Sequence, residues 1–146
     1  MSATTLTTSA HQVKAAQIGA LAGIGGGLVF GAMMAMNGML PMVGMLVKQE
    51  NAVVGFIVHL IISAFIGAVY GMVATRLPAT WLAAIVGGAV NGVVWWVLGA
   101  LILMPLLLGM VPMILVVGAM QWMSLVGHLV YGVITGAVFL LLSRSV

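Results

Sequence analysis

Four long apolar runs make up most of the sequence. They cover residues 15–40, 52–74, 80–103 and 120–142. Each run is long enough to cross a bilayer as a helix, which takes about 20 residues. The 146-residue chain is 64% hydrophobic and only 3% charged, whereas a soluble domain carries about 25% charge. We therefore predict an all-α integral membrane protein with four transmembrane helices.

The few charged residues predict the orientation. Lys14, Arg76 and Arg144 flank the N-terminus, the second connection and the C-terminus, which share one side in a protein with four spans. The other side holds Lys48, offset by Glu50, the only acidic residue. Because cytoplasmic loops carry the excess of Lys and Arg, we predict that both termini are cytoplasmic.

Two segments outside the spans differ in character. Residues 1–14 form a short polar tail before a single transmembrane domain at 15–146. The third connection, "PLLLGMVPMILVVGAMQ" at 105–121, is a loop by its prolines but apolar by content. Non-helical backbone at bilayer depth survives only when protein shields it. The connection could lie in the membrane interface or dip back into the bilayer, where a neighbouring protein would cover it. It could also lengthen the flanking helices, as two long tilted helices with a short kinked turn.

The two halves of the domain resemble each other. "IVHLIISAFIGAVY" at 57–70 and "VGHLVYGVITGAVF" at 126–139 share His-Leu, a glycine eight residues later and Ala-Val-aromatic. Gly23 and Gly87, like Pro41 and Pro105, match at an offset of 64. The likeness predicts a duplicated hairpin in parallel orientation. The predicted repeats are residues 15–75 and 79–143.

Small residues recur at every fourth position of each span, and such positions share one helix face. Because lipid provides no hydrophobic force between helices, close backbone contact through small residues drives their association. We predict packing within one bundle, with an oligomer interface as the alternative. Gly25 and Gly26 lie off this stripe and indicate a second face on the first span. The predicted packing residues are Gly19, Gly23, Gly27, Gly31, Ser63, Gly67, Gly71, Gly88, Gly92, Gly132 and Gly136.

His59 and His128 lie on these small-residue faces, 69 positions apart in the sequence. An ionisable residue inside a membrane indicates function by default, and three interpretations fit. Each neutral imidazole could hydrogen-bond a backbone carbonyl or a polar neighbour and hold helices together. Both could ligate a haem, or each a chlorophyll. Both could handle protons or ions, although such relays usually include acids and no span contains one.

Methionines gather at the non-cytoplasmic end of the first span and in the third connection. Thioethers are soft ligands that suit copper(I), and they also fill irregular gaps where prolines break helices. We expect the second role and keep a copper site as the alternative. The candidate ligands in that alternative are Met36, Met39, Met42 and Met45.

Catalysis and nucleic-acid binding are not expected. The sequence has no cysteine, no aspartate and one glutamate, so it offers neither a carboxylate pair nor an acid to orient a catalytic histidine. A net charge of +3 from four basic residues is too sparse for a nucleic-acid surface.

The C-terminal half, "MPLLLGMVPM…MSLVGHLVYGVITGAVF", resembles a family of small bacterial four-helix inner-membrane proteins of unknown function. In that family a Met-Pro turn precedes a helix that begins His-Leu-x-Tyr-Gly and continues to Gly-Ala-Val-aromatic. The matching positions are His128, Tyr131, Gly132 and Gly136. "MMAMNGMLP" looks like the matching first helix. The resemblance implies a fold and a bacterial inner-membrane location, and it brings no activity.

Together these features predict a non-catalytic accessory subunit of a larger membrane complex, for example respiratory or photosynthetic. Its expected partners are other integral membrane subunits and the lipid bilayer, and no cofactor is expected. A haem- or chlorophyll-binding module that uses His59 and His128 is the first alternative. A small transporter or copper carrier is the second.

Overall fold

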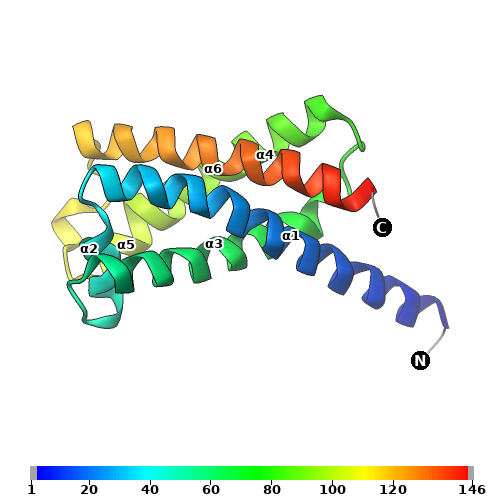
Figure 1. The fold of residues 1–146 in the computed structure, drawn as a ribbon, viewed down its shortest axis with the longest axis horizontal. Helices are drawn as coiled ribbons and strands as arrows, with labels where there is room; N and C mark the ends of the chain where they lie inside the picture. Colours follow the sequence, from blue (N-terminus) through cyan, green and yellow to red (C-terminus); the bar gives the residue numbers. More distant parts are fainter. Residues whose placement is uncertain (1–2, 145–146) are drawn as a thin grey trace.

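The computed structural model describes residues 3–144, and every regular element among them is helical. Four long helices run through the molecule (Figure 1). The four segments long and apolar enough to cross a membrane are Ala10–Met36, Ala52–Ala74, Trp81–Leu107 and Ala119–Arg144. The four predicted spans are therefore confirmed as membrane-capable helices.

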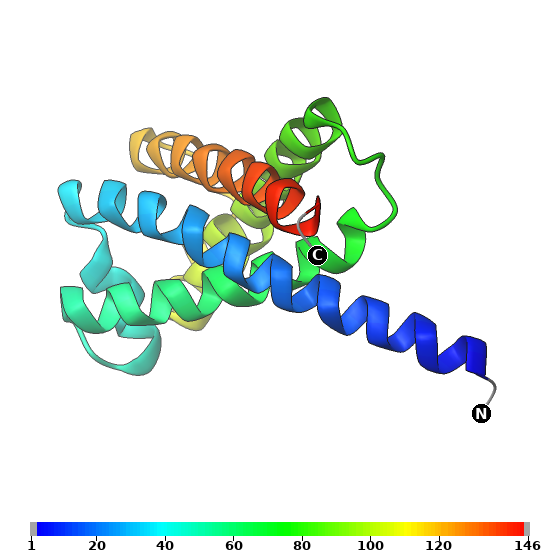
Figure 2. The ribbon, with the colours of Figure 1, turned by 45° about the vertical axis from the view of Figure 1, so that its right-hand side comes forward.

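The described part of the chain contains helices and helical turns and no strand. The elements are α1 (Ala3–Met36), α2 (Leu40–Gly44), the 3₁₀ turn η1 (Met45–Val47), α3 (Ala52–Ala74), α4 (Trp81–Trp95), the π-helical η2 (Trp96–Leu103), α5 (Met104–Leu107), the 3₁₀ turn η3 (Val111–Met113) and α6 (Ala119–Arg144). Helix α1 begins at Ala3, so residues 3–14 of the predicted polar tail continue the first helix, and residues 1–2 of that tail lie outside the described residues. Figure 2 shows this part of α1 projecting beyond the other helices.

Polar caps fix where two of the spans begin. The Asn51 side chain accepts hydrogen bonds from the amides of Val53 and Val54, at 2.8 and 3.1 Å. Thr80 accepts one from the amide of Ala83, at 3.2 Å. Such caps satisfy amides that the first helical turn leaves without a partner. The connections before these caps are short: α3 begins at Ala52 after η1 ends at Val47, and α4 begins at Trp81 after α3 ends at Ala74.

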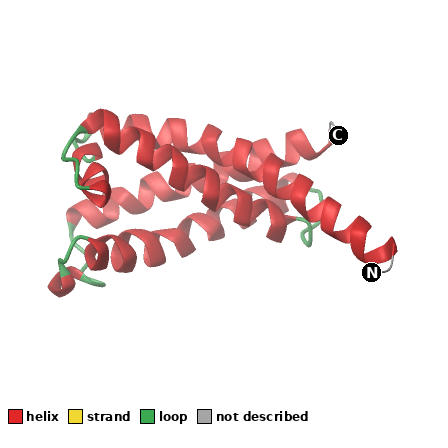
Figure 3. Ribbon diagram, turned by 90° about the horizontal axis from the view of Figure 1, so that it is seen from below, coloured by secondary structure: helices red, strands yellow, loops and turns green. Residues whose placement is uncertain are grey.

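The helices pack as two antiparallel hairpins joined through α1 and α6. Helix α1 packs along α3 and also along α6, and α4 packs along α6, whereas only a few contacts join α3 to α4. The spatial order is thus α3–α1–α6–α4. Both ends of the described chain and the α3–α4 connection lie at one end of the bundle, which Figures 1 and 3 show from two directions.

Buried side chains form two clusters along the centre of the bundle. Phe30, Met34 and Tyr131 belong to the larger one, towards the end that holds α2. Ala22, Tyr70 and Phe139 form the smaller one, towards the end that holds the termini. Both clusters contain residues of α1, α3 and α6, so the core lies where these three helices meet.

The apolar connection predicted at 105–121 is only partly helical. Helix α5 extends the third span to Leu107, and η3 forms one short turn after it. Leu115 adopts a positive φ of 59°, and its amide donates a hydrogen bond to the carbonyl of Leu101 in η2, at 3.0 Å. The connection is therefore tied back to the end of the third span, while much of its apolar surface stays exposed.

Candidate functional site: the histidine pair

His59 joins α3 to α1 through the backbone. Its Nε2 lies 2.9 Å from the carbonyl oxygen of Gly27, and the side chain is buried. Because a carbonyl can only accept, this nitrogen carries the proton. A Cβ at position 27 would come within 2.6 Å of the Ser63 side chain. The glycine therefore lets α3 approach closely enough for the imidazole to reach the backbone of α1.

His128 makes its hydrogen bond within its own helix. Its Nδ1 lies 2.8 Å from the carbonyl oxygen of Ser124, one turn earlier in α6. The Ser124 hydroxyl lies 3.3 Å from the same nitrogen. Both histidines thus bond a backbone carbonyl, but only His59 links two helices. The two positions that look alike in the sequence have different surroundings.

Phe30 of α1 lies between the two imidazoles. Its ring centroid is 5.3 Å from that of His59 and 4.9 Å from that of His128, and both pairs are edge-to-face. Gly127 of α6 leaves room for the phenyl ring, because a Cβ there would clash with it. The result is a buried aromatic row across α3, α1 and α6. Edge-to-face contacts of this kind add about 0.5–1.5 kcal/mol beyond the area that they bury.

Tyr131 ties α6 to α3 beside this row. Its hydroxyl donates to the carbonyl of Ser63 at 2.7 Å, one turn after His59. Thr135, which is fully buried, donates to the carbonyl of Tyr131 at 2.7 Å. A Cβ on Gly26 would lie 2.6 Å from both the Thr135 hydroxyl and the Tyr131 carbonyl. The second glycine face predicted for the first span therefore contacts α6 through Gly26, whereas Gly25 faces open space.

The row of rings bears on the cofactor hypotheses. A macrocycle ligated by both histidines would have to occupy the space that Phe30 fills. In the described chain, no group of three or more His, Cys, Asp or Glu side chains could hold a metal ion. The imidazoles of His59 and His128 and the hydroxyl of Tyr131 each bond a backbone carbonyl, and Phe30 packs between the two imidazoles. Such contacts hold helices together. Tetrapyrrole binding through His59 and His128 stays a prediction.

The predicted packing glycines lie where helices touch. Gly19 and Gly23 lie against Gly67 and Gly71, so backbones of α1 and α3 meet. At Gly27 and Gly31 the neighbours are side chains of α3 instead: Ser63, Phe56 and His59. In the second hairpin, a Cβ on Gly88, Gly92, Gly132 or Gly136 would meet backbone of the facing helix. Substituting one of the glycines that faces backbone would push a pair of helices apart.

The four candidate copper ligands do not share one environment. Met39 packs against the larger buried cluster, whereas Met36 is 79% exposed and Met42 and Met45 are also exposed. Met39 therefore fills a gap in the core, the role expected of a flexible apolar side chain. A copper site made from these residues stays a prediction.

Sequence reasoning missed Phe30 and Gly127, which complete the aromatic row. Phe30 lies in an apolar run with nothing local to mark it. Gly127 directly precedes His128 and falls off the four-residue stripe of Gly132 and Gly136. A glycine beside a buried histidine was the available signal, because it leaves room for a large side chain of a neighbouring helix.

Comparison with known protein families, with curated proteins and with solved structures found no match for this chain.

Proposed function

We propose that the chain is a non-catalytic accessory subunit of a larger integral membrane complex. One observation carries the proposal: the connection between α5 and α6 exposes apolar side chains on largely non-helical backbone. The exposed apolar residues of this connection include Met110, Val111, Leu115, Val116 and Val117. In lipid, non-helical backbone needs protein around it, because lipid cannot satisfy its hydrogen-bonding groups. Another membrane subunit would provide that cover.

The exposed face of α4 is consistent with this proposal without carrying it. In the third span only 17% of the most apolar window is buried, against 44% in the first span. Lipid alone can cover an apolar helix face, so this exposure fits a free bilayer as well as a partner. The irregular connection distinguishes a chain surrounded by lipid alone from a chain covered by a partner, because lipid cannot bond its non-helical backbone.

A native gel of solubilised source membranes tests the proposal, followed by mass spectrometry of the proteins that migrate with the chain. We expect migration in a complex much larger than the chain itself. Val116→Lys, in the exposed connection, should release the chain from that complex, since a charge at an apolar contact is costly to desolvate. Val13→Lys is the matched control, because Val13 is equally a surface valine, on α1. Migration only as a monomer or small homo-oligomer would contradict the proposal.

We also propose that both termini face the cytoplasm. The basic residues at the terminus end support this, since Arg144 donates to the Ala79 carbonyl at 2.8 Å and so lies beside the connection that carries Arg76. The chain has no cysteine, so single cysteines report its sidedness. In intact cells an impermeant maleimide should label Gln49→Cys and should reach Ala79→Cys only after lysis. The reverse pattern would overturn the orientation.

The internal duplication and the family resemblance stay part of the proposal. The packing of the two hairpins supports the duplication, with a register shifted by one residue: Gly23 lies against Ser63 and Gly67, and Gly88, rather than the predicted Gly87, lies against Gly132 and Gly136. These partners on α3 and α6 are 69 positions apart in the sequence, the offset of the histidines. A bacterial inner-membrane location rests on the resemblance and on the four apolar spans.

A further inference from the structure

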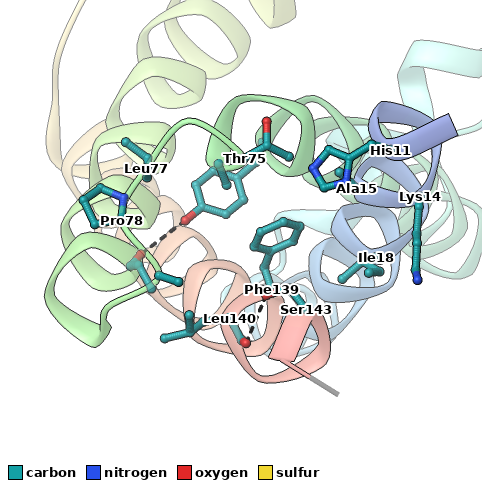
Figure 4. Close-up of a pocket in the computed structure, with 14 residues that line it drawn as sticks. His11, Lys14, Ala15, Ile18, Thr75, Leu77, Pro78, Phe139, Leu140 and Ser143 are labelled. Atoms are coloured by element: carbon teal, nitrogen blue, oxygen red, sulfur yellow. Dashed lines mark hydrogen bonds between the residues drawn. The ribbon is translucent and has the colours of Figure 1, made fainter. Parts of the chain in front are cut away.

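A pocket opens at the terminus end of the bundle, where the helices diverge. It has a volume of about 390 Å³ and is lined by residues of α1, α3, α4, α6 and the α3–α4 connection. Small-molecule sites usually measure about 300–1,000 Å³. Figure 4 shows side chains of these elements around one space. The pocket lies apart from the histidine pair and is not used by the proposed role as a subunit.

The interior of the pocket is mainly apolar. Ile18, Phe139 and Leu140 line it, together with alanines from three elements. Its hydroxyl groups are already engaged as donors: Tyr70 donates to the Ala84 carbonyl at 3.3 Å and Ser143 to the Leu140 carbonyl at 3.1 Å. The walls can therefore hold an apolar body but have few protons to give to an anion.

The mouth of the pocket is basic. His11 and Lys14, both exposed residues of α1, belong to the lining, and Figure 4 places them on the same helix at the edge of the space. Arg76 and Arg144 lie at this end of the bundle as well, while Glu50, the only acidic residue in the sequence, precedes α3 at the other end. An anionic group at the mouth would meet positive charge and no opposing carboxylate side chain.

The mouth lies at the level expected for lipid head groups. The Arg144 guanidinium lies over the Trp81 ring, 5.9 Å from its centroid. Tryptophan and basic side chains are enriched at the membrane–water interface. Basic pockets between transmembrane helices on the cytoplasmic side are a known way of holding lipid head groups. The depth, the charge and the lining thus agree on one class of ligand.

We propose that this pocket binds an anionic amphiphile, with a phosphate or carboxylate group at His11 and Lys14 and an apolar chain between Ile18, Phe139 and Leu140. The chemistry is shared by an anionic phospholipid of the surrounding leaflet and by a free single-chain amphiphile. The pocket holds only part of a large lipid, so the head group and the start of one chain are the parts recognised.

Binding of dodecyl phosphate to the purified full-length chain in a neutral detergent, read by native mass spectrometry, tests the site. One molecule should bind per chain, at least about tenfold more tightly than dodecanol, which lacks the charge. Lys14→Gln should weaken binding about fivefold, the effect of one basic group near a membrane surface, and His11→Gln should weaken it less, because a neutral imidazole offers the anion only a hydrogen-bond donor. Ala79→Phe, at an exposed lining residue of the connection, should block binding by filling the mouth.

Arg76→Gln is the matched control, because it removes one charge at the same end but does not line the pocket. It should change the affinity less than twofold. An equal loss in Arg76→Gln and Lys14→Gln would overturn the proposal, since binding would then follow overall charge. Unchanged binding in Ala79→Phe, with helicity and melting temperature retained, would also overturn it, since the ligand would then lie elsewhere.

Nanodiscs distinguish the two sources of the ligand. In phosphatidylcholine discs, dodecyl phosphate should bind the wild-type chain as in detergent. If phosphatidylglycerol in the disc weakens that binding, an anionic lipid of the leaflet competes for the pocket and is its occupant. If phosphatidylglycerol has no effect, the pocket selects a free single-chain amphiphile. Both results require the pocket, whereas failure of dodecyl phosphate to bind in the phosphatidylcholine disc would overturn it.

Discussion

The α1–α6 contact and the α3–α4 contact join the same two hairpins but are built differently. Between α1 and α6, Phe30 packs on Gly127, and Gly26 lies against Tyr131 and Thr135. Between α3 and α4 the interactions are sparse. The Tyr70 hydroxyl reaches the Ala84 carbonyl at 3.3 Å, and the Phe65 and Trp95 rings are 6.2 Å apart.

The two contacts differ in packing because α1 and α4 do not carry glycine at equivalent positions. Helix α1 has Gly26 on its second face, so α6 can approach its backbone. Gly88 packs on α6 as Gly23 packs on α3, an offset of 65, and at that offset α4 has Asn91 where α1 has Gly26. Two helices that present side chains rather than backbone stay further apart. The α3–α4 side therefore stays loosely packed, and the terminus-end pocket lies where this side reaches the end of the bundle.

The largest expected difference concerns two phenylalanines. Phe30→Ala should lower the free energy of unfolding by about 3–5 kcal/mol, because a buried phenyl ring leaves a cavity. Phe30 is 6% exposed, whereas Phe65 is 61% exposed. Phe65→Ala should therefore cost less than about 1 kcal/mol, the range of a surface aromatic contact. Unfolding in mixed micelles with increasing sodium dodecyl sulfate measures both values.

Equal losses for the two phenylalanines would break the comparison, since they would mean that the α3–α4 contact is as tight as the α1–α6 contact. Phe30→Leu serves as a control for the aromatic row. It keeps most of the apolar volume and removes the edge-to-face contacts with His59 and His128. Its loss should fall well short of that of Phe30→Ala if cavity formation dominates.

Much of the fold could be predicted from local patterns. Four apolar runs gave four membrane-capable helices because length and hydropathy are properties of each segment alone. Glycines at every fourth residue marked the faces of α1 and α6 for the same reason, since that spacing fixes one side of a helix.

The partner of each face could not be predicted in the same way. Nothing local says that Gly26 meets Tyr131, that Phe30 lies between His59 and His128, or that Tyr131 reaches Ser63. These pairings depend on how two hairpins dock, which involves residues more than 60 positions apart in the sequence. The likeness of the two histidine segments does not extend to their hydrogen bonds, because His59 bonds another helix and His128 its own.

Two glycine-to-alanine substitutions should change the free energy of unfolding differently. Gly26→Ala places a Cβ 2.6 Å from the Tyr131 carbonyl oxygen, and backbone cannot move aside without separating α1 from α6. We expect a loss of about 1–3 kcal/mol, typical of overpacking. Gly87→Ala meets the tip of the Leu77 side chain at 2.8 Å, which can rotate away. That change should be neutral or stabilise by up to about 1 kcal/mol, since alanine favours the helix.

The same unfolding titration measures both glycine variants, and helicity by circular dichroism shows whether each remains folded. Gly25→Ala is the control within α1, because a Cβ there meets nothing within 4 Å. It reports the intrinsic gain of replacing glycine in this helix. A loss in Gly87→Ala as large as that in Gly26→Ala would show that the α3–α4 side tolerates no more volume than the α1–α6 side.

The smallest expected difference lies between two tyrosine hydroxyls. Tyr131→Phe removes a buried 2.7 Å hydrogen bond to the Ser63 carbonyl, and Tyr70→Phe removes a 3.3 Å bond to the Ala84 carbonyl. Hydrogen bonds inside membrane proteins contribute about 0.6 kcal/mol on average and at most about 1.7. The short Tyr131 bond should lie above that average and the long Tyr70 bond below it. A larger loss at Tyr70 would mean that the hydroxyl, rather than helix packing, holds α4 beside α3.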